Sequence, residues 1–196
     1  MSKSDSAAPK KERNKAIRWI ITVFISTILA TSVISLASEE LMSVSSIAVA
    51  FIILLVIIFV GILFDIIGVA VTSADEKPFH SMAARKVPGA LEAIRLLRNA
   101  EKVGSICNDV VGDICGVISG SASATIAAQV LQNFEFTWPR LASLMMSALV
   151  AGLTVGGKAI GKGLAIQSCT TIVHFVGRLI HRMQRIPKIF RRETKK

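Results

Sequence analysis

Two aspartates, Asp109 and Asp113, lie four residues apart in the stretch "SICNDVVGDICGVISGSASATI", which is otherwise built from apolar and small residues. Residues at this spacing share one face of a helix, and Asn108 lies beside the pair. Carboxylate and amide oxygens bind hard cations such as Mg²⁺ or Na⁺. A carboxylate at the centre of a membrane helix costs roughly 2.5–3.5 kcal/mol, so it predicts a functional site. The alternative is that both acids lie in water at the mouth of the helix, shortly after Gly104.

A third aspartate, Asp65, lies in the apolar segment "FDIIGVAVTSAD". Thr72 and Ser73 follow it at spacings near multiples of a helical turn, so these side chains are predicted to line one stripe. Asp65 is about 12 Å from Ser73 along a helix, which places it well inside an apolar span. The alternative is a carboxylate paired with a lysine or bonded to hydroxyls. The predicted metal ligands are Asp65, Ser73, Asn108, Asp109 and Asp113, with Thr72 and Ser119 as further polar lining.

Lys158 and Lys162 are one helical turn apart in the glycine-rich segment "GGKAIGKG". They are predicted to tune the charge of the site, with Lys158 as the partner of an intramembrane aspartate. Glycine weakens a helix interior, so this segment also allows a broken helix that exposes backbone carbonyls. The alternative is that Lys158 is an ordinary lysine reaching the membrane boundary.

Catalytic constellations are missing from the sequence. His80, His174 and His181 are scattered, the cysteines have no metal-binding spacing, and no nucleophile is paired with a base. We therefore do not expect an enzyme.

Four apolar stretches must position these residues. The chain is 52% hydrophobic and only 18% charged, whereas soluble domains carry about 25% charged residues. Residues 17–37, 46–73, 104–131 and 139–157 are each long enough for a helix to cross a bilayer, which takes about 20 residues. The predicted fold is all-α, a polytopic membrane protein with about four transmembrane helices.

Basic residues are distributed unevenly over the predicted loops. Of the 23 lysines and arginines, all but Arg140 lie before Trp19, between the second and third spans, or from Lys158 onward. Basic residues collect on the cytoplasmic side of membrane proteins. We expect a multi-pass protein of the cell membrane with both termini in the cytoplasm. The net charge of +10 then serves orientation and contact with anionic headgroups, and nucleic acid is not an expected partner.

Two basic segments are predicted to lie along the membrane rather than across it. Residues 76–103 show helical spacing interrupted by Pro88-Gly89, which predicts a juxtamembrane helical hairpin. Residues 166–196 form a basic amphipathic helix and tail, for which an interfacial position is favoured. A fifth span within 164–180 is the alternative, and it would place the basic tail outside. Residues 1–16 form a basic N-terminal tail.

The order of these motifs resembles the transmembrane domain of the CorC/CorB/CNNM family of magnesium transporters. The matching segments are "VAVTSAD" at 69–75, the hairpin, "RNAEKVGS" at 98–105, "GVISG" at 116–120 and "GKAIGKGLA" at 157–165, within a core over 46–165. The resemblance implies an ion site between the second, third and fourth spans and a homodimer formed through the transmembrane helices. The span at 17–37 is an addition that simple members of the family lack, and the family's nucleotide-binding CBS domains have no counterpart here.

Departures from the family pattern leave two functions open. The acid of the family's last motif falls on Lys158 and its proline on Gly161, while Asp109 and Asp113 occupy the region of its asparagine ligands. One hypothesis is a divalent-cation transporter for Mg²⁺, with Na⁺ as a coupling ion. The other is a non-transporting regulatory or scaffold protein with an unknown protein partner, in which Lys158 replaces the cation.

Overall fold

The computed structural model is all-α and describes residues 10–133 and 138–193. Its long helices are α1 (Lys10–Val44), α2 (Ile47–Ser73), α6 (Gly112–Asn133), α7 (Pro139–Gln167) and α8 (Cys169–Glu193). Shorter helices connect α2 to α6: α3 (Lys77–Ala84), α4 (Ala90–Leu97), α5 (Ala100–Ser105) and the π-helix η1 (Ile106–Val111). Most of the predicted N-terminal tail and the last three residues of the chain lie outside the described residues.

Four helical segments of the described chain are long and apolar enough to cross a membrane. They run over Ile17–Leu41, Ile47–Ser73, Ala100–Asn133 and Pro139–Gln167. The prediction of about four transmembrane helices in an all-α fold is therefore confirmed, and the chain is a candidate multi-pass membrane protein. The third and fourth segments are longer than predicted, because each helix continues through polar residues that flank its apolar run.

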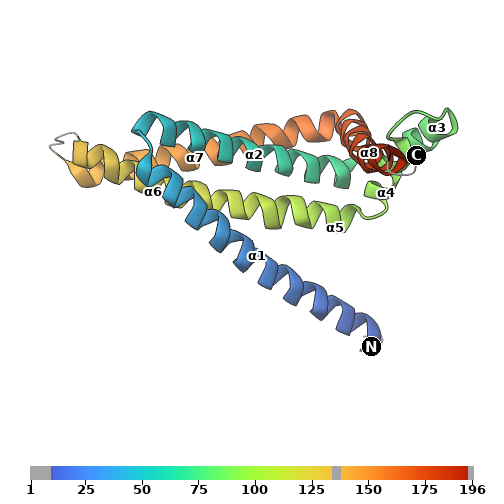
Figure 1. Ribbon diagram of the computed structural model, residues 1–196, viewed down its shortest axis with the longest axis horizontal. Helices are drawn as coiled ribbons and strands as arrows, with labels where there is room; N and C mark the ends of the chain where they lie inside the picture. Colours follow the sequence, from blue (N-terminus) through green and yellow to red (C-terminus); the bar gives the residue numbers. More distant parts are fainter. Residues whose placement is uncertain (1–9, 134–137, 194–196) are drawn as a thin grey trace, which may run out of the picture.

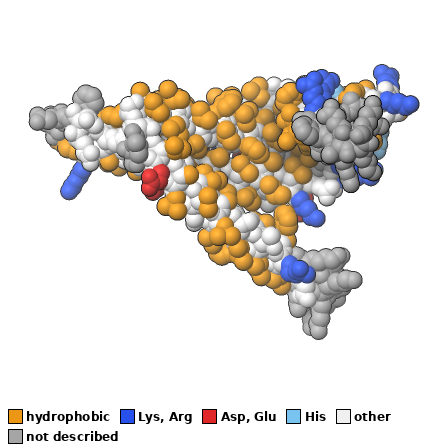
Figure 2. Space-filling model, in the orientation of Figure 1, with side chains coloured by type: hydrophobic (Ala, Val, Ile, Leu, Met, Phe, Trp, Pro, Cys, Tyr) orange, Lys and Arg blue, Asp and Glu red, His pale blue; other side chains and the backbone are white. Residues whose placement is uncertain are grey.

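Three of these helices, α2, α6 and α7, run side by side as a bundle, and α1 leaves the bundle at an angle (Figure 1). The C-terminal part of α1 packs against α6. Its apolar residues nearer the N-terminus, such as Ile20 and Phe24, are exposed. Figure 2 shows apolar side chains over the length of the molecule, and basic side chains gathered mostly at the end that carries α3, α4 and α8. This distribution agrees with helices that face lipid and a basic end that faces headgroups.

Two apolar clusters hold the bundle together. The first is built from α2, α6 and α7, and its members include Leu54, Ile58, Ile126 and Val150. The second joins α2, α3, α4 and the α7–α8 region through Val71, Phe79, Leu97, Ala165 and Val173. Between the buried α2 residues of the two clusters lie three further buried residues of this helix, Gly61, Asp65 and Gly68.

The predicted helical hairpin is confirmed as α3 and α4. The chain reverses at Gly89, whose φ of 88° lies in the left-handed region that favours glycine. A side chain at Gly89 would also overlap the backbone of α8 at Arg178. Gly89 therefore allows both the turn and the close contact between α4 and α8.

The basic amphipathic helix predicted at the C-terminus is confirmed as α8. The helix of α7 ends at Gln167 and a new helix begins at Cys169, so residues 164–180 do not form one continuous span. Val173 and Gly177 of α8 are buried, whereas Phe175, Leu179 and Met183 are exposed. One face of α8 thus docks on the protein and another remains uncovered.

The glycine-rich end of the fourth span is helical, so the broken helix that its glycines would allow does not occur. Helix α7 continues through Gly157 and Gly161 to Gln167. A side chain at Gly161 would lie 2.8 Å from Cγ1 of Ile66 on α2, so this glycine lets the two helices approach closely. The helical irregularity lies instead in the third span, at the π-helix η1.

Candidate cation site

Asp65 is the buried carboxylate of the bundle. It lies on α2 between the two apolar clusters and is only 4% exposed. Its Oδ2 atom accepts no hydrogen bond within the described part of the chain. A buried acceptor without a donor costs about 1–3 kcal/mol, and more when it is charged. This carboxylate therefore lacks the donors that would normally stabilise it inside a protein.

Asn108 supplies a second buried oxygen without a donor. Its Oδ1 atom is buried and has no hydrogen-bond partner among the described residues. It lies against Gly68, where an added Cβ would overlap it. Gly68 is three residues after Asp65, so both positions are on the same face of α2. Asp65 therefore lies on the face of α2 that carries Gly68, the residue that Asn108 contacts.

The π-helix explains how Asn108 reaches this position. Residues Ile106–Val111 form one wider turn between α5 and α6. Single π turns insert a residue into a helix and are frequent at functional sites. The wider turn changes which side chains face α2, because the helix rotates less per residue there. Asn108 faces Gly68, whereas its neighbour Asp109 is exposed.

The predicted pair of aspartates, Asp109 and Asp113, is not buried in the bundle. Asp109 and Asp113 are both exposed, and Asp109 Oδ2 accepts a hydrogen bond of 2.9 Å from the hydroxyl of Ser105. The described residues contain no group of three His, Cys, Asp or Glu side chains that could hold a metal ion together. Of the five predicted ligands, Asp65 and Asn108 are the two that have a buried side-chain oxygen without a hydrogen-bond partner among the described residues.

The other predicted oxygen donors are placed as follows. Ser73 is exposed at the last residue of α2. The Thr72 hydroxyl bonds to its own helix, with carbonyl oxygens of Gly68 at 3.1 Å and Val69 at 3.0 Å. Ser119 is buried and donates to the carbonyl oxygen of Gly116 at 2.9 Å. Thr72 and Ser119 are therefore already satisfied by backbone carbonyls.

Lys162, and not Lys158, is the lysine that faces the buried aspartate. Lys162 Nζ lies 3.9 Å from Asp65 Oδ2, and its side chain is 54% exposed. At this distance the two groups attract each other without a hydrogen bond. Lys158 Nζ instead donates to the carbonyl oxygen of Gly112 at 3.4 Å. Both lysines come from α7, one turn apart, so their spacing alone did not reveal which of them meets Asp65.

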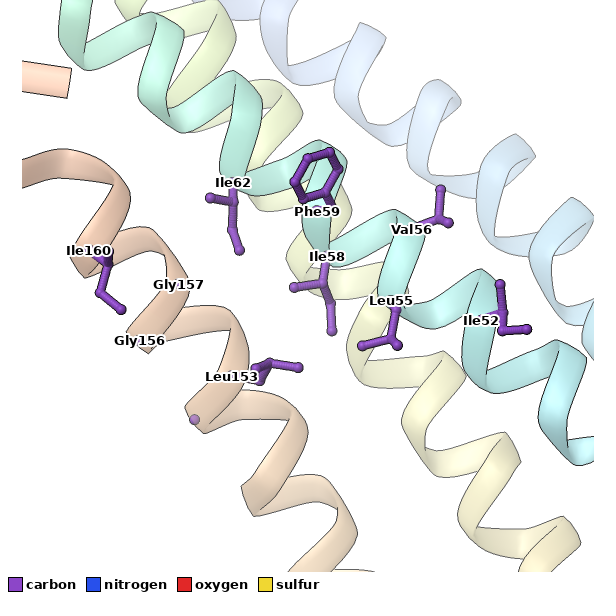
Figure 3. Close-up of a pocket in the computed structure, with 11 residues that line it drawn as sticks. Ile52, Leu55, Val56, Ile58, Phe59, Ile62, Leu153, Gly156, Gly157 and Ile160 are labelled. Atoms are coloured by element: carbon purple, nitrogen blue, oxygen red, sulfur yellow. The ribbon is translucent and has the colours of Figure 1, made fainter. Parts of the chain in front are cut away.

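A separate apolar groove lies beside the site, between α2 and α7 (Figure 3). Its volume is about 650 Å³, and its lining includes Ile58, Phe59 and Ile62 of α2 and Leu153 of α7. Every residue that lines it is apolar or glycine. The groove therefore offers no ligand to an ion.

Two further polar features occur in the structure, of which the sequence did not predict the first and predicted one lining residue, Ser119, of the second. One is the pair of Glu92 on α4 and His181 on α8, whose Oε1 and Nδ1 atoms are 2.9 Å apart. The two residues are far apart in the chain, and no local pattern links them. The other is a groove between α6 and α7 that Ser123, Ser147 and Lys158 help to line. The run of serines in the third span was the signal for that groove.

Comparison with known proteins yields no relative. No protein family, curated protein or solved structure matches this chain. The resemblance to the magnesium-transporter family stays a prediction from the motifs.

Proposed function

We propose that this chain is a membrane transporter for a hard cation, with Mg²⁺ as the first candidate and Na⁺ as the second. The site lies between α2, η1 and α7, and Asp65 and Asn108 are its protein ligands. The observation that carries the proposal is the pair of buried oxygens, Asp65 Oδ2 and Asn108 Oδ1, that accept no hydrogen bond within the described residues. A cation would supply the positive partner that both atoms lack.

The small number of protein ligands suits these ions. Mg²⁺ dehydrates reluctantly, keeps several of its waters, and is often bound through one or two carboxylates. One carboxylate and one amide oxygen therefore support a partly hydrated Mg²⁺ ion. Na⁺ is also a hard cation that oxygen atoms bind, and its single charge would leave the site closer to neutral.

Lys162 is placed to compete with the ion for the Asp65 carboxylate. Its ammonium is 3.9 Å from Asp65 Oδ2, yet more than half of the side chain is exposed. In the absence of a cation the ammonium partly neutralises Asp65. When a cation binds, the flexible lysine is free to swing toward the solvent or the headgroups. Exchange between a mobile ammonium and an ion gives a reversible site, which transport requires.

The same contact supports the second candidate, a non-transporting regulatory or scaffold protein. In that case the Lys162 ammonium takes the place of the cation permanently and the ion pair holds α2 to α7. The sequence predicted this role for Lys158, and the 3.9 Å separation of Lys162 Nζ and Asp65 Oδ2 supports Lys162 for it. The two functions differ in whether a cation displaces the lysine.

Ion-dependent stability and flux test the proposal. The protein is melted in nanodiscs with choline, Na⁺ or Mg²⁺ chloride, and Mg²⁺ entry into proteoliposomes is followed with an internal dye. We expect the wild type to be stabilised by Mg²⁺ and to carry flux, and Asp65→Asn to lose both. The matched control is Asp113→Asn, an exposed aspartate, which should behave as the wild type.

Two results would decide against transport at this site. Equal flux in Asp65→Asn and wild type would remove Asp65 as a ligand. A wild type that reconstitutes in a folded state, carries no flux of either ion and melts identically in all three salts would instead support the scaffold function.

A further inference from the structure

We propose that the groove between α6 and α7 binds a small carboxylate-type anion through the ammonium group of Lys158. This binding site is separate from the cation site of Asp65 and does not depend on transport. The groove has a volume of about 320 Å³, and its polar lining consists of Ser119 and Ser123 of α6 with Ser147, Thr154 and Lys158 of α7.

The charge of the groove selects its ligand. Lys158 is the charged residue that lines it, and no aspartate or glutamate of the described chain does so. An ammonium group has three donors and no acceptor. Lys158 uses one donor on the carbonyl oxygen of Gly112 at 3.4 Å. The positive charge of the ammonium group repels cations, and its remaining donors can bind an anion. A charge next to apolar spans is costly unless it is paired.

Ser123 provides the second, independent observation. It is only 2% exposed, and its Oγ atom has no hydrogen-bond partner among the described residues. A serine or threonine in a helix usually donates to a carbonyl oxygen of the preceding turn. Ser119 and Thr154, which line the same groove, do so at 2.9 Å and 2.8 Å. The hydroxyl of Ser123 is thus a buried donor on the groove wall that its own helix does not use.

The α6 side of the groove leaves space for a molecule larger than a halide. Gly116 and Gly120 lie one turn apart on α6, and a side chain added at either would meet nothing within 4 Å. A halide would occupy a small part of 320 Å³. A carboxylate fits the volume better, because its charged end can pair with Lys158 while the rest of the molecule lies along the hydroxyls.

Lactate is a suitable probe because it carries a carboxylate and a hydroxyl. The full chain in nanodiscs is melted against rising choline lactate, with choline chloride and neutral lactamide at the same concentrations. Choline salts keep Na⁺ and Mg²⁺ away from the cation site. We expect lactate to raise the melting temperature in a saturable manner, and chloride and lactamide to have little effect.

Variants assign the binding to the groove. Lys158→Met should weaken lactate binding by roughly tenfold or more, since it removes a charged donor. Lys162→Met, on the same helix one turn away and outside the groove lining, is the matched control and should bind as the wild type. Asp65→Asn should also retain lactate binding, so a failure of the cation site does not affect this test. Ser123→Ala removes one hydroxyl and should weaken binding several-fold, which keeps the test available if Lys158→Met does not fold.

Three results would overturn the proposal. Absence of a lactate effect on the wild type would remove the anion site. An equal effect of chloride would contradict the carboxylate class. Unchanged lactate binding in folded Lys158→Met, or in Ser123→Ala when Lys158→Met does not fold, would place the ligand elsewhere.

Discussion

Lys162 Nζ on α7 lies 3.9 Å from the buried Asp65 Oδ2 on α2, and no hydrogen bond joins the two groups. The carboxylate is almost fully buried, whereas more than half of the lysine side chain is exposed. The aspartate is therefore fixed by packing, and the lysine can leave. This asymmetry makes Asp65 a site at which an external cation can compete with a residue of the protein.

Removing the ammonium should strengthen cation binding. We expect Lys162→Met to raise the apparent affinity for Mg²⁺ about fivefold, which corresponds to ~1 kcal/mol, the upper range for a partly exposed ion pair. The methionine keeps most of the apolar stem of the lysine. Mg²⁺ titrations followed by thermal melting in nanodiscs give the affinity.

Lys158→Met is the control for this experiment, because Lys158 Nζ bonds to Gly112 and not to Asp65. The Mg²⁺ affinity of Lys158→Met should stay within about twofold of the wild type, a smaller change than the roughly fivefold increase expected for Lys162→Met. Weaker Mg²⁺ binding in Lys162→Met than in the wild type would show that the lysine supports the ion site instead of competing for it.

The contact between Gly68 and Asn108 should tolerate no side chain. In Gly68→Ala the new Cβ would overlap Asn108 Oδ1 and approach Cys107. Such overpacking typically costs 1–3 kcal/mol, so we expect a lower melting temperature and a displaced Asn108. The displacement should also weaken Mg²⁺ binding, and both effects are measured in the same melting titration.

Gly163→Ala is the matched control, because a side chain there meets nothing within 4 Å. It should be neutral or stabilising by up to about 1 kcal/mol, as expected for alanine in place of glycine within a helix. Equal melting temperatures and equal Mg²⁺ affinities in the two alanine variants would contradict the close packing of η1 on α2.

The sequence predicted Asp65 and Asn108 as ligands for a physical reason. Asp65 interrupts a long apolar helix, and a carboxylate inside an apolar span is energetically costly unless it has a partner. Asn108 was grouped with Asp109 and Asp113 because it is adjacent to Asp109 in the sequence. Adjacent residues of a helix do not face the same way, and Asn108 is the one that contacts Gly68 of α2, which a local pattern does not reveal.

The number and order of the helices were also predictable, but not their exact ends. Apolar length defines a span, whereas the end of a helix depends on tertiary contacts. The glycines at 157 and 161 illustrate this limit, because their composition allowed a broken helix, whereas they lie within α7 where Ile62 and Ile66 of α2 approach. Likewise, spacing placed Lys158 and Lys162 on one helix, and only packing decides which lysine meets Asp65.

Acid should loosen the contact between α8 and α4. Burial on its own would raise the pKa of Glu92, but its hydrogen bond with His181, a backbone hydrogen bond and the charges of His181 and Arg95 outweigh burial, so the net pKa lies below its ordinary value of 4.5. A carboxyl with a lowered pKa stabilises the folded state fully above its ordinary pKa. That contribution is lost as the pH falls below 4.5 and through the pKa of the folded state.

Hydrogen exchange in α8 tests this pH dependence. We expect protection of residues 173–181, corrected for the intrinsic exchange rate, to fall in the wild type as the pH is lowered from 6 to 3, with most of the loss below pH 4.5. Glu92→Gln lacks the titrating carboxyl, so it should show weaker protection at pH 6 and a smaller change on acidification. An identical pH dependence in both proteins would mean that Glu92 does not control the docking of α8.

The uncovered face of α8 should lie in the headgroup region of the bilayer. Phe175, Leu179 and Met183 follow one another at intervals of four residues and are 67%, 50% and 62% exposed, while Arg178 and Arg182 flank them and are also exposed. An amphipathic helix with this arrangement buries its apolar face about 5–10 Å into the boundary between headgroups and acyl chains.

A tryptophan introduced on this face reports its depth. Trp19 and Trp138 are first replaced by phenylalanine, so that the indole of the Leu179→Trp variant supplies the fluorescence signal. Lipids brominated near the headgroup should quench it more strongly than lipids brominated at the chain ends, because the helix lies parallel to the surface. Arg182→Trp, on the basic flank of the same helix, should be quenched less by either lipid. Stronger quenching of the Leu179→Trp variant by chain-end bromines would contradict the interfacial position and favour a membrane-inserted α8.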